Sequence, residues 1–230
     1  MSEVISYGGS IIAPEKIDIS FIKKVVRILS EKKEKMFVIV GGGVIARDYI
    51  ARARELKGNE CLLDEIGILA TRINAHLLLC ALNDLNVDVY PRIAETIDEA
   101  ITAKNGMVVM GGTVPGHTTD AVSALLAERV GARKLLIATS VEGVYTVDPK
   151  KDNKAKKIDL LTPEQLIGIV MKNRSIAGSI SVIDLLASRI IERSNIECWI
   201  FDGRNLEDLK RGLENKREGF NGTIVTVKSS

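Results

Sequence analysis

The sequence predicts an α/β protein, a three-layer sandwich with a mainly parallel central sheet between layers of helices. Short, fully apolar runs such as residues 36–40 and 134–139 are typical of strands that a parallel sheet buries on both faces. Segments with helical periodicity separate these runs, and that alternation is characteristic of parallel α/β sheets. Three of the predicted strands also lead directly into glycine-bearing turns, at residues 8–10, 41–43 and 111–113.

The composition is that of an ordinary globular protein with almost no net charge. The chain has 230 residues, with 32 Lys and Arg against 30 Asp and Glu. Without a basic stripe or a signal peptide, and with no apolar run of roughly 20 residues, we expect no nucleic-acid partner and no membrane segment. Three cysteines without CxxC spacing indicate reduced, buried thiols in a cytoplasmic protein.

The first half of the chain alternates strands and helices. We expect strands at residues 3–7, 36–40, 86–90 and 107–110. We expect helices at 18–30, 44–57, 62–85 and 94–103, and Asp18 is the predicted N-cap of the first.

The second half continues the pattern. We expect helices at residues 121–130, from 162 onward, at 181–193 and at 206–213, and strands at 134–139, 197–201 and 223–227. Residues 150–157 are polar and basic. They form either a solvated hairpin or a phosphate-facing loop, and the sequence favours solvation.

Residues 111–120 form the most informative loop. They follow a predicted strand and end in Thr118, Thr119 and Asp120, which are suited to cap the next helix. Glycine N–H groups and threonine hydroxyls beside a helix N-terminus can hold an anion such as a phosphate. A plain capped turn would have the same residues, but the two other glycine turns favour a binding role.

Two common nucleotide-binding motifs do not account for the glycine turns. Residues 41–46 fit the loose dinucleotide fingerprint, but a helix fills the interval in which that fingerprint requires a second strand ending in an acidic residue. The phosphate-binding loop motif G-x-x-x-x-G-K-[ST] does not occur. Three turns at the carboxyl edge of one parallel sheet could instead hold a run of phosphates by their backbone N–H groups.

The order and spacing of six motifs resemble the amino acid kinase family, and within it the uridylate kinases of the archaeal type. The motifs are residues 8–10, 41–43 with Ala46 and Arg47, 64–67, 111–120, 139–149 and 183–187. The resemblance implies one amino acid kinase domain over residues 1–230. Its N-terminal lobe, about 1–130, would bind the acceptor, and its C-terminal lobe, about 131–230, would bind ATP.

The resemblance also implies the reaction and the site. It implies phosphorylation of UMP to UDP with ATP and Mg²⁺, in a cytoplasmic homohexamer that serves pyrimidine nucleotide synthesis. The implied UMP-binding residues are Gly42, Asp64, Thr113, Val114, Pro115, Gly116, His117, Thr118 and Thr119. The implied ATP-binding residues are Gly9, Ser10, Gly43, Arg47, Thr139, Tyr145 and Asp148. Arg47, Asp120 and Asp184 are the implied catalytic residues, and no protein metal ligand is assigned.

The sequence departs from the family pattern at two places. Ser6 and Tyr7 occupy the end of the first strand, where many members carry a lysine. Arg47 is therefore our candidate for the cation that balances charge on the transferring phosphoryl group. The usual Thr-Asn-Val-Asp-Gly run reads Thr-Ser-Val-Glu-Gly at residues 139–143.

Two other functions remain open at this point. A sister kinase with the same fold would use another acceptor, such as acetylglutamate, carbamate or isopentenyl phosphate. A non-catalytic protein of this fold would hold a nucleotide or an oxyanion without turnover, and the missing lysine keeps that possibility open.

Overall fold

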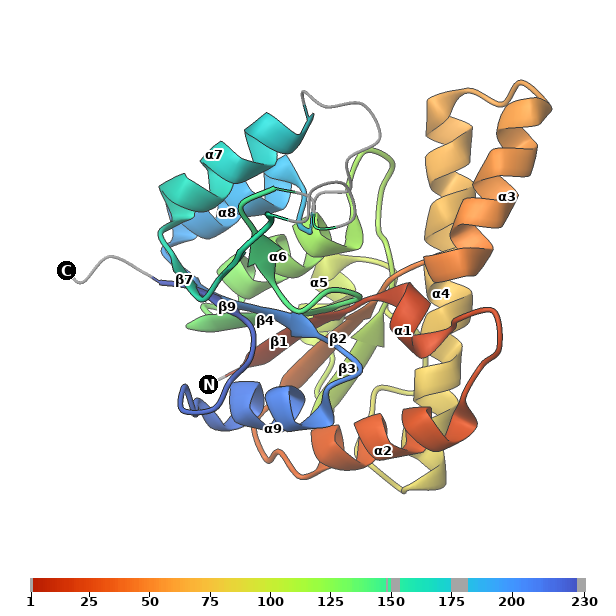
Figure 1. The fold of residues 1–230 in the computed structure, drawn as a ribbon. Helices are drawn as coiled ribbons and strands as arrows, with labels where there is room; N and C mark the ends of the chain where they lie inside the picture. Colours follow the sequence, from red (N-terminus) through yellow and green to blue (C-terminus); the bar gives the residue numbers. More distant parts are fainter. Residues whose placement is uncertain (1, 148, 150–153, 175–181, 227–230) are drawn as a thin grey trace.

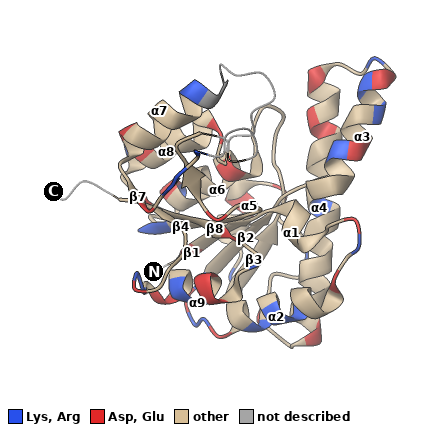
Figure 2. Cartoon of the chain, in the orientation of Figure 1, with Lys and Arg blue, Asp and Glu red and all other residues tan. Residues whose placement is uncertain are grey.

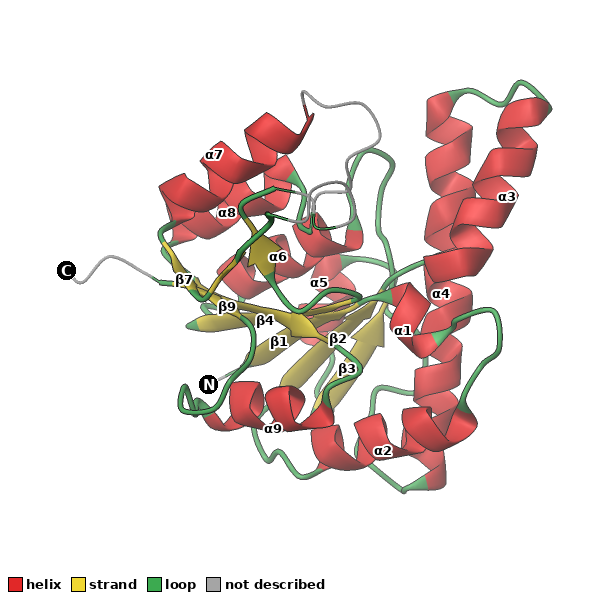
Figure 3. Ribbon diagram, viewed as in Figure 1, coloured by secondary structure: helices red, strands yellow, loops and turns green. Residues whose placement is uncertain are grey.

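A seven-stranded sheet forms the centre of the molecule, with helices packed on both faces (Figures 1 and 3). The computed structural model describes residues 2–147, 149, 154–174 and 182–226. The strand order is β3-β2-β1-β4-β8-β9-β7. The strands are β1 (Glu3–Tyr7), β2 (Met36–Val40), β3 (Met107–Met110), β4 (Lys134–Thr139), β7 (Leu160–Leu161), β8 (Glu197–Asp202) and β9 (Thr223–Val225). Only the β8–β9 pair of this sheet is antiparallel, which confirms the predicted fold class.

The helices lie in two layers, and one pair extends beyond the sheet. Figure 1 shows α5 to α8 above the sheet, α2 and α9 below it, and α3 with one half of α4 projecting as a hairpin. The helices are α1 (Gly9–Ile12), α2 (Ile19–Ser30), α3 (Gly43–Glu55), α4 (Glu60–Asp84), α5 (Ile97–Thr102), α6 (Thr119–Arg129), α7 (Pro163–Arg174), α8 (Leu185–Ser194) and α9 (Leu206–Glu214). A separate hairpin pairs β5 (Val144–Tyr145) with β6 (Lys157–Ile158).

Alternation along the strands divides the core between the two faces of the sheet. Val4 and Phe37 pack in a cluster with residues of α5, α6 and α8. Ile5 and Val38, the next residues along, pack in a second cluster with residues of α2, α4 and α9. Successive side chains of a strand point to opposite faces, so a strand covered on both sides must be apolar throughout.

Capping side chains begin several helices where the sequence predicts them. Asp18 accepts a hydrogen bond from the Phe21 N–H at 3.0 Å, which confirms it as the N-cap of α2. Thr118 likewise caps α6. Each cap satisfies an N–H group that has no partner inside its own helix.

The predicted strand at residues 86–90 is wrong. Within this segment only Val89 forms a bridge, to Met107 of β3, and the next bridge joins Ala94 to Met110. Pro91 lies between these two bridges, and a proline has no N–H to continue a ladder. The segment therefore follows the edge of β3 without becoming a strand.

Two predicted helices begin later than expected. The helix predicted at 94–103 is α5, which begins at Ile97 because Thr96 caps it, while the Ala94 N–H bonds to Val109 of β3. The helix predicted at 181–193 is α8, which begins after its cap Asp184; residue 181 lies outside the described residues. Residue 227, the predicted end of the last strand, lies outside them as well.

The basic segment at residues 150–157 belongs in part to the β5–β6 hairpin. Residues 150–153 lie outside the described part of the chain. Lys157 lies in β6, and its ammonium donates to Asn221 and approaches Asp159 at 3.5 Å. This lysine therefore has partners of its own on the surface of the hairpin.

The prediction of three buried thiols is wrong for two of them. Cys198 is buried in β8, whereas Cys61 and Cys80 are exposed on α4. Burial raises the pKa of the Cys198 thiol well above its ordinary value, and the charge of Asp120 adds to the effect.

Helix α4 is more apolar than predicted from the sequence. By length and composition alone it could cross a membrane, which corrects the expectation that no segment could. In the structure it packs against β2, β3, α2 and α3, yet Leu69 and Ile73 are each 58% exposed. Elsewhere, charges of both signs alternate over the helices, as on α2 and α3 in Figure 2.

Candidate functional site

The three glycine turns meet at one edge of the sheet. They follow β1, β2 and β3, which are adjacent parallel strands in register. The Gly41 N–H donates to the Tyr7 carbonyl at 2.9 Å, and so joins the end of β1 to the second turn. The predicted convergence of these turns is confirmed, because parallel neighbouring strands end at the same edge.

Glycine is required where the first two turns touch. A Cβ atom on Gly9 would lie 2.1 Å from the Gly41 carbonyl oxygen, closer than any real contact. Gly43 has a φ of +61°, a left-handed conformation that is strained for other residues. These positions let two backbone segments come together where a side chain would separate them.

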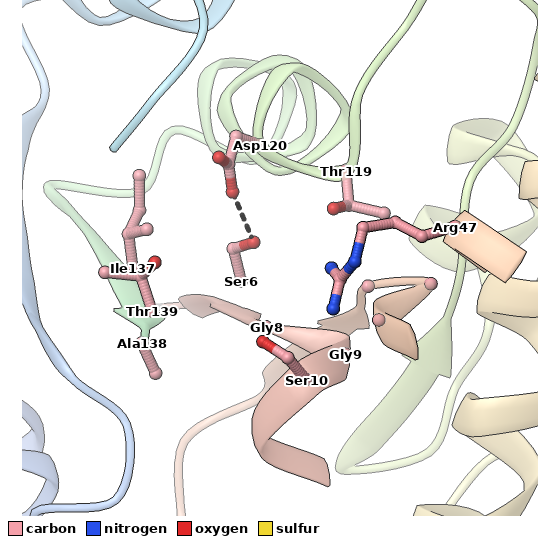
Figure 4. A pocket seen from close by; sticks show the side chains of 13 residues that line it. Ser6, Gly8, Gly9, Ser10, Arg47, Thr119, Asp120, Ile137, Ala138 and Thr139 are labelled. Atoms are coloured by element: carbon pink, nitrogen blue, oxygen red, sulfur yellow. Dashed lines mark hydrogen bonds between the residues drawn. The ribbon is translucent and has the colours of Figure 1, made fainter. Parts of the chain in front are cut away.

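A first cavity, the inner cavity, lies between these turns and the start of α6 (Figure 4). Its volume is about 210 Å³. Its lining includes Gly9, Ser10, Gly43, Arg47 and Thr139 from the predicted ATP-binding set, together with Asp120. The other lining residues are Ser6, Gly8, Gly41, Gly42, Thr119, Ile137 and Ala138.

A second cavity, the outer cavity, extends from the inner one toward α4. Its volume is about 340 Å³. Six residues of the predicted UMP-binding set line it, namely Gly42, Asp64, Gly116, His117, Thr118 and Thr119. The other lining residues are Gly43, Ala46, Arg47, Ile50, Gly67, Ile68, Thr71 and Gly112. Gly42, Gly43, Arg47 and Thr119 line both cavities, so two ligands placed in them would meet at these residues.

Arg47 provides positive charge at this junction. It lies one turn into α3, and Figure 4 shows its guanidinium directed toward the centre of the inner cavity. The side chain is exposed, and within the described part of the chain no carboxylate forms an ion pair with it. Arg52, one turn later, is instead paired with Asp48 and Glu55.

Asp120 places a carboxyl group on the opposite wall of the inner cavity. It lies in the first turn of α6, and the Ser6 hydroxyl donates to its Oδ1 at 2.8 Å (Figure 4). Burial raises the pKa of Asp120 to about 6; the Asp184 charge adds to the rise, and the Ser6 hydrogen bond opposes it.

Asp184 lines neither cavity and instead contacts the loop at residues 111–120. Its Oδ1 accepts from the Ala187 N–H at 2.9 Å and caps α8, while its Oδ2 accepts from the Thr118 hydroxyl. Thr118 in turn caps α6 and lines the outer cavity. Asp184 is thus a support for the residue that contacts the cavity.

Asp64 lies in the outer cavity and does not cap its helix. Asn59 caps α4 by accepting from the Leu62 N–H at 3.0 Å. The Asp64 carboxylate instead accepts from the Gly116 N–H at 2.7 Å. Asp64 is therefore not the N-cap of α4, and it holds the loop at residues 111–120 against that helix.

Some predicted site residues lie apart from the cavities. Thr113, Val114 and Pro115 belong to the loop but line neither cavity, and Val114 is 48% exposed. Tyr145 lies in β5, and its hydroxyl donates to Glu142 at 3.0 Å. Asp148 lies outside the described residues.

Several residues that build the site were not predicted from the sequence. Thr71 and Ile68 on α4 and Ile50 on α3 line the outer cavity. Asn74, also on α4, donates to the glycine turn after β2. Thr71 and Asn74 are polar residues on the buried face of a mainly apolar helix, and that contrast was the available signal.

Proteins of similar sequence and fold identify the family of this chain. The model of the amino acid kinase family matches residues 1–202. Uridylate kinase of Archaeoglobus fulgidus is 46% identical over 219 residues, covering 95% of this chain and 98% of its own. Uridylate kinase of Methanocorpusculum labreanum is 45% identical over 227 residues, covering 96% of this chain and 94% of its own. The crystal structure of the A. fulgidus enzyme superposes with a TM-score of 0.83 at 39% identity, covering 98% of this chain and all of that one.

Proposed function

This chain belongs to the amino acid kinase family, and from that premise we propose that it transfers the γ-phosphoryl group of ATP to UMP, giving UDP and ADP. The observation that carries the proposal is the pair of cavities that share Gly42, Gly43, Arg47 and Thr119. A phosphotransferase must bring the phosphates of two nucleotides together, and this junction is where they would meet. Names of relatives with high identity over nearly the whole chain support UMP as the acceptor.

The inner cavity would hold the ATP phosphates. The N-termini of α3 and α6 both border it, and such helix ends favour anions. Gly9, Ser10, Gly43 and Arg47 would contact these phosphates. Thr139, Tyr145 and Asp148 are proposed to frame the adenosine, in a lobe of about residues 131–230.

The outer cavity would hold UMP, in a lobe of about residues 1–130. Asp64 can accept hydrogen bonds from two ribose hydroxyls on its remaining lone pairs. The loop at residues 113–119 would enclose the base and the phosphate. His117 would serve as a donor or a shape element of this loop.

In the reaction a phosphate oxygen of UMP attacks the γ-phosphorus of ATP. The new O–P bond forms as the bond to the β–γ bridging oxygen breaks, and ADP leaves with that electron pair. The acceptor is already an ionised phosphate at neutral pH, so the protein need not remove a proton from it. The loose transition state depends on positioning and on charge balance, and Arg47 would supply the positive charge.

The residues present fit Mg²⁺ bound mainly through the nucleotide. Mg²⁺ in such sites keeps several waters and takes one or two carboxylates along with substrate phosphates. Among the described residues no group of three His, Cys, Asp or Glu side chains could form a metal cage, and Asp120 is the carboxylate that lines the inner cavity. When bound, the ion would neutralise phosphate charge.

We propose that the working form is a cytoplasmic homohexamer. The exposed Leu69 and Ile73 on α4 support an assembly, because adjacent large apolar side chains on a helix face are typical of surfaces that copies of a chain cover.

A coupled assay with ATP and Mg²⁺ tests the function. UMP should be phosphorylated far faster than CMP or AMP, with dUMP included to probe the ribose contact. Equal rates on all three ribonucleoside monophosphates would contradict the proposed acceptor. Turnover of acetylglutamate, carbamate or isopentenyl phosphate instead would identify a sister kinase, and nucleotide binding without turnover would identify a non-catalytic protein.

A further inference from the structure

The amide side chain of Asn74 is buried behind the glycine turn that follows β2. The residue is fully buried on α4. Its Nδ2 donates to the carbonyl oxygens of Gly41 and Gly42, each at 2.9 Å. Its Oδ1 is also buried and has no hydrogen-bond partner within the described residues.

These two hydrogen bonds determine where the turn directs its donors. In a planar trans peptide the N–H points away from the C=O. The carbonyls of Gly41 and Gly42 point to Asn74, so the N–H groups of Gly42 and Gly43 point to the opposite side. Both glycines line both cavities, and neither N–H has a partner among the described residues.

Burial alone does not explain an asparagine at this position. A buried acceptor without a partner is destabilising, and native proteins contain few of them. An apolar residue would avoid that cost, but it would release both carbonyls. The same turn of α4 also holds the third glycine turn, where the Thr71 hydroxyl accepts from the Gly112 N–H at 2.7 Å.

We propose that Asn74 is a positioning residue, which holds the N–H groups of Gly42 and Gly43 ready for the phosphates of both nucleotides. It touches neither ligand and acts only through the turn. The proposal rests on the proposed kinase function, which names the two ligands. Beyond that function, we infer that the Asn74 side chain, which lies outside both cavities, affects the binding of UMP and of ATP together.

Kinetics of Asn74→Leu and Asn74→Asp test this role, with Leu78→Ala as the control. Leucine cannot donate, and a carboxylate would repel both carbonyls. Each Asn74 variant should lower kcat/KM for UMP and for ATP by about 10- to 100-fold, as expected when two donors to a phosphate are misplaced. Leu78 is buried one turn further along α4. Its truncation should lower the Tm but leave both kinetic constants unchanged well below that Tm.

The pH dependence of Asn74→Asp separates positioning from mere stability. A carboxyl buried against two carbonyls has a raised pKa, and once protonated it can donate to one of them. The kcat/KM of Asn74→Asp relative to wild type should therefore rise as the pH falls from about 8 to about 6. Wild-type constants for Asn74→Leu, or a loss confined to one nucleotide, would overturn the inference. A wild-type protein without turnover of UMP would instead reject the proposed function.

Discussion

Arg47 is the single residue on which the proposed chemistry depends most directly. Its guanidinium lies where both cavities meet, and it has no ion-pair partner within the described chain. Arg47→Ala should lower kcat by about 10²-fold or more, because a charge contact made in the transition state is lost. Arg52→Ala, on the same helix but paired with Asp48 and Glu55, should keep the wild-type kcat. A rise in KM alone for Arg47→Ala would show ground-state binding only.

Asp120 should reduce stability at neutral pH. Its pKa is raised from 3.8 to about 6 by folding, so the folded protein holds this proton more tightly than the unfolded chain. The sign follows from linkage: the stability that this bound proton contributes is fully present below pH 3.8 and is lost as the pH rises through about 6. Asp120→Asn keeps the acceptor for Ser6 and removes the charge. At pH 7.5 it should raise the free energy of unfolding by about 1 to 3 kcal/mol.

Urea titrations of both proteins across pH measure this difference. The gap between Asp120→Asn and wild type should close as the pH is lowered from about 6 to about 4. A gap that does not change with pH would mean that Asp120 is not desolvated. The kcat of the variant should fall, because Asp120 is the carboxylate proposed to act beside the phosphates in the inner cavity.

Asp64 should affect one substrate only. A carboxylate that binds ribose hydroxyls contributes roughly 1.5–3 kcal/mol, so Asp64→Ala should raise KM for UMP by about 10- to 100-fold and leave KM for ATP unchanged. Asn59→Ala is the matched control, because Asn59 is the true cap of α4. It should cost about 1 kcal/mol of stability and change neither KM. Equal effects of Asp64→Ala on both nucleotides would reject the assignment of the outer cavity.

At the scale of elements, the contact between the first two glycine turns should tolerate no side chain. Gly9→Ala would put a Cβ 2.1 Å from the Gly41 carbonyl oxygen and force the turns apart. We expect a loss of about 1–3 kcal/mol in stability and a large loss of kcat. Gly168→Ala lies inside α7 with open space around it, and should stabilise by about 0.5–1 kcal/mol. Thermal unfolding compares the two; an unchanged Gly9→Ala protein would mean that the turns are not in contact.

The elements predicted correctly from the sequence were those that depend on residues close together in the chain. The apolar runs of β2, β3 and β4 and the cap Asp18 each depend on residues close together in the chain, and all were predicted. The strand expected at 86–90 failed because its apolar residues meet β3 only in single bridges around Pro91. The short helix α1 carries no periodic signal over four residues.

The glycine turns of the site could be predicted from the sequence, but the side chains that hold these turns in place could not. Gly9 and Gly43 lie in turns that follow β1 and β2, and Arg47 lies one turn into the helix after β2. The order of the sheet therefore brings these residues together. The contact between Asn74 and Gly41 spans 33 positions of the sequence. A periodic pattern can indicate that a residue is buried, but it cannot indicate which distant residue it contacts. The positions of Pro115 and Tyr145 depend on the paths of loops, which no periodic pattern describes.

For the molecule as a whole, the exposed apolar face of α4 should decide the state of assembly. Leu69→Lys with Ile73→Lys would place charges on that face. We expect wild type to have about six times the chain mass of 25.1 kDa by light scattering, and the double variant to dissociate. Lys24→Glu, on the exposed face of α2, is a control for surface charge. A monomeric wild type would contradict the proposed hexamer, and an intact double variant would place the interface elsewhere.

The wall shared by the two cavities should also couple the binding of the two proposed nucleotides. The hydrogen-bond donors of the shared wall cannot all bind two polyanions at once; these donors belong to Gly42, Gly43, Arg47 and Thr119. In addition, the negative charges of two neighbouring nucleotides repel each other. Each nucleotide should therefore weaken the other in the absence of a divalent cation, and by the same factor in both directions, since coupling free energies are reciprocal. We expect a single molecule that joins uridine and adenosine through one phosphate chain to avoid this conflict, because it would carry fewer charges across the same wall.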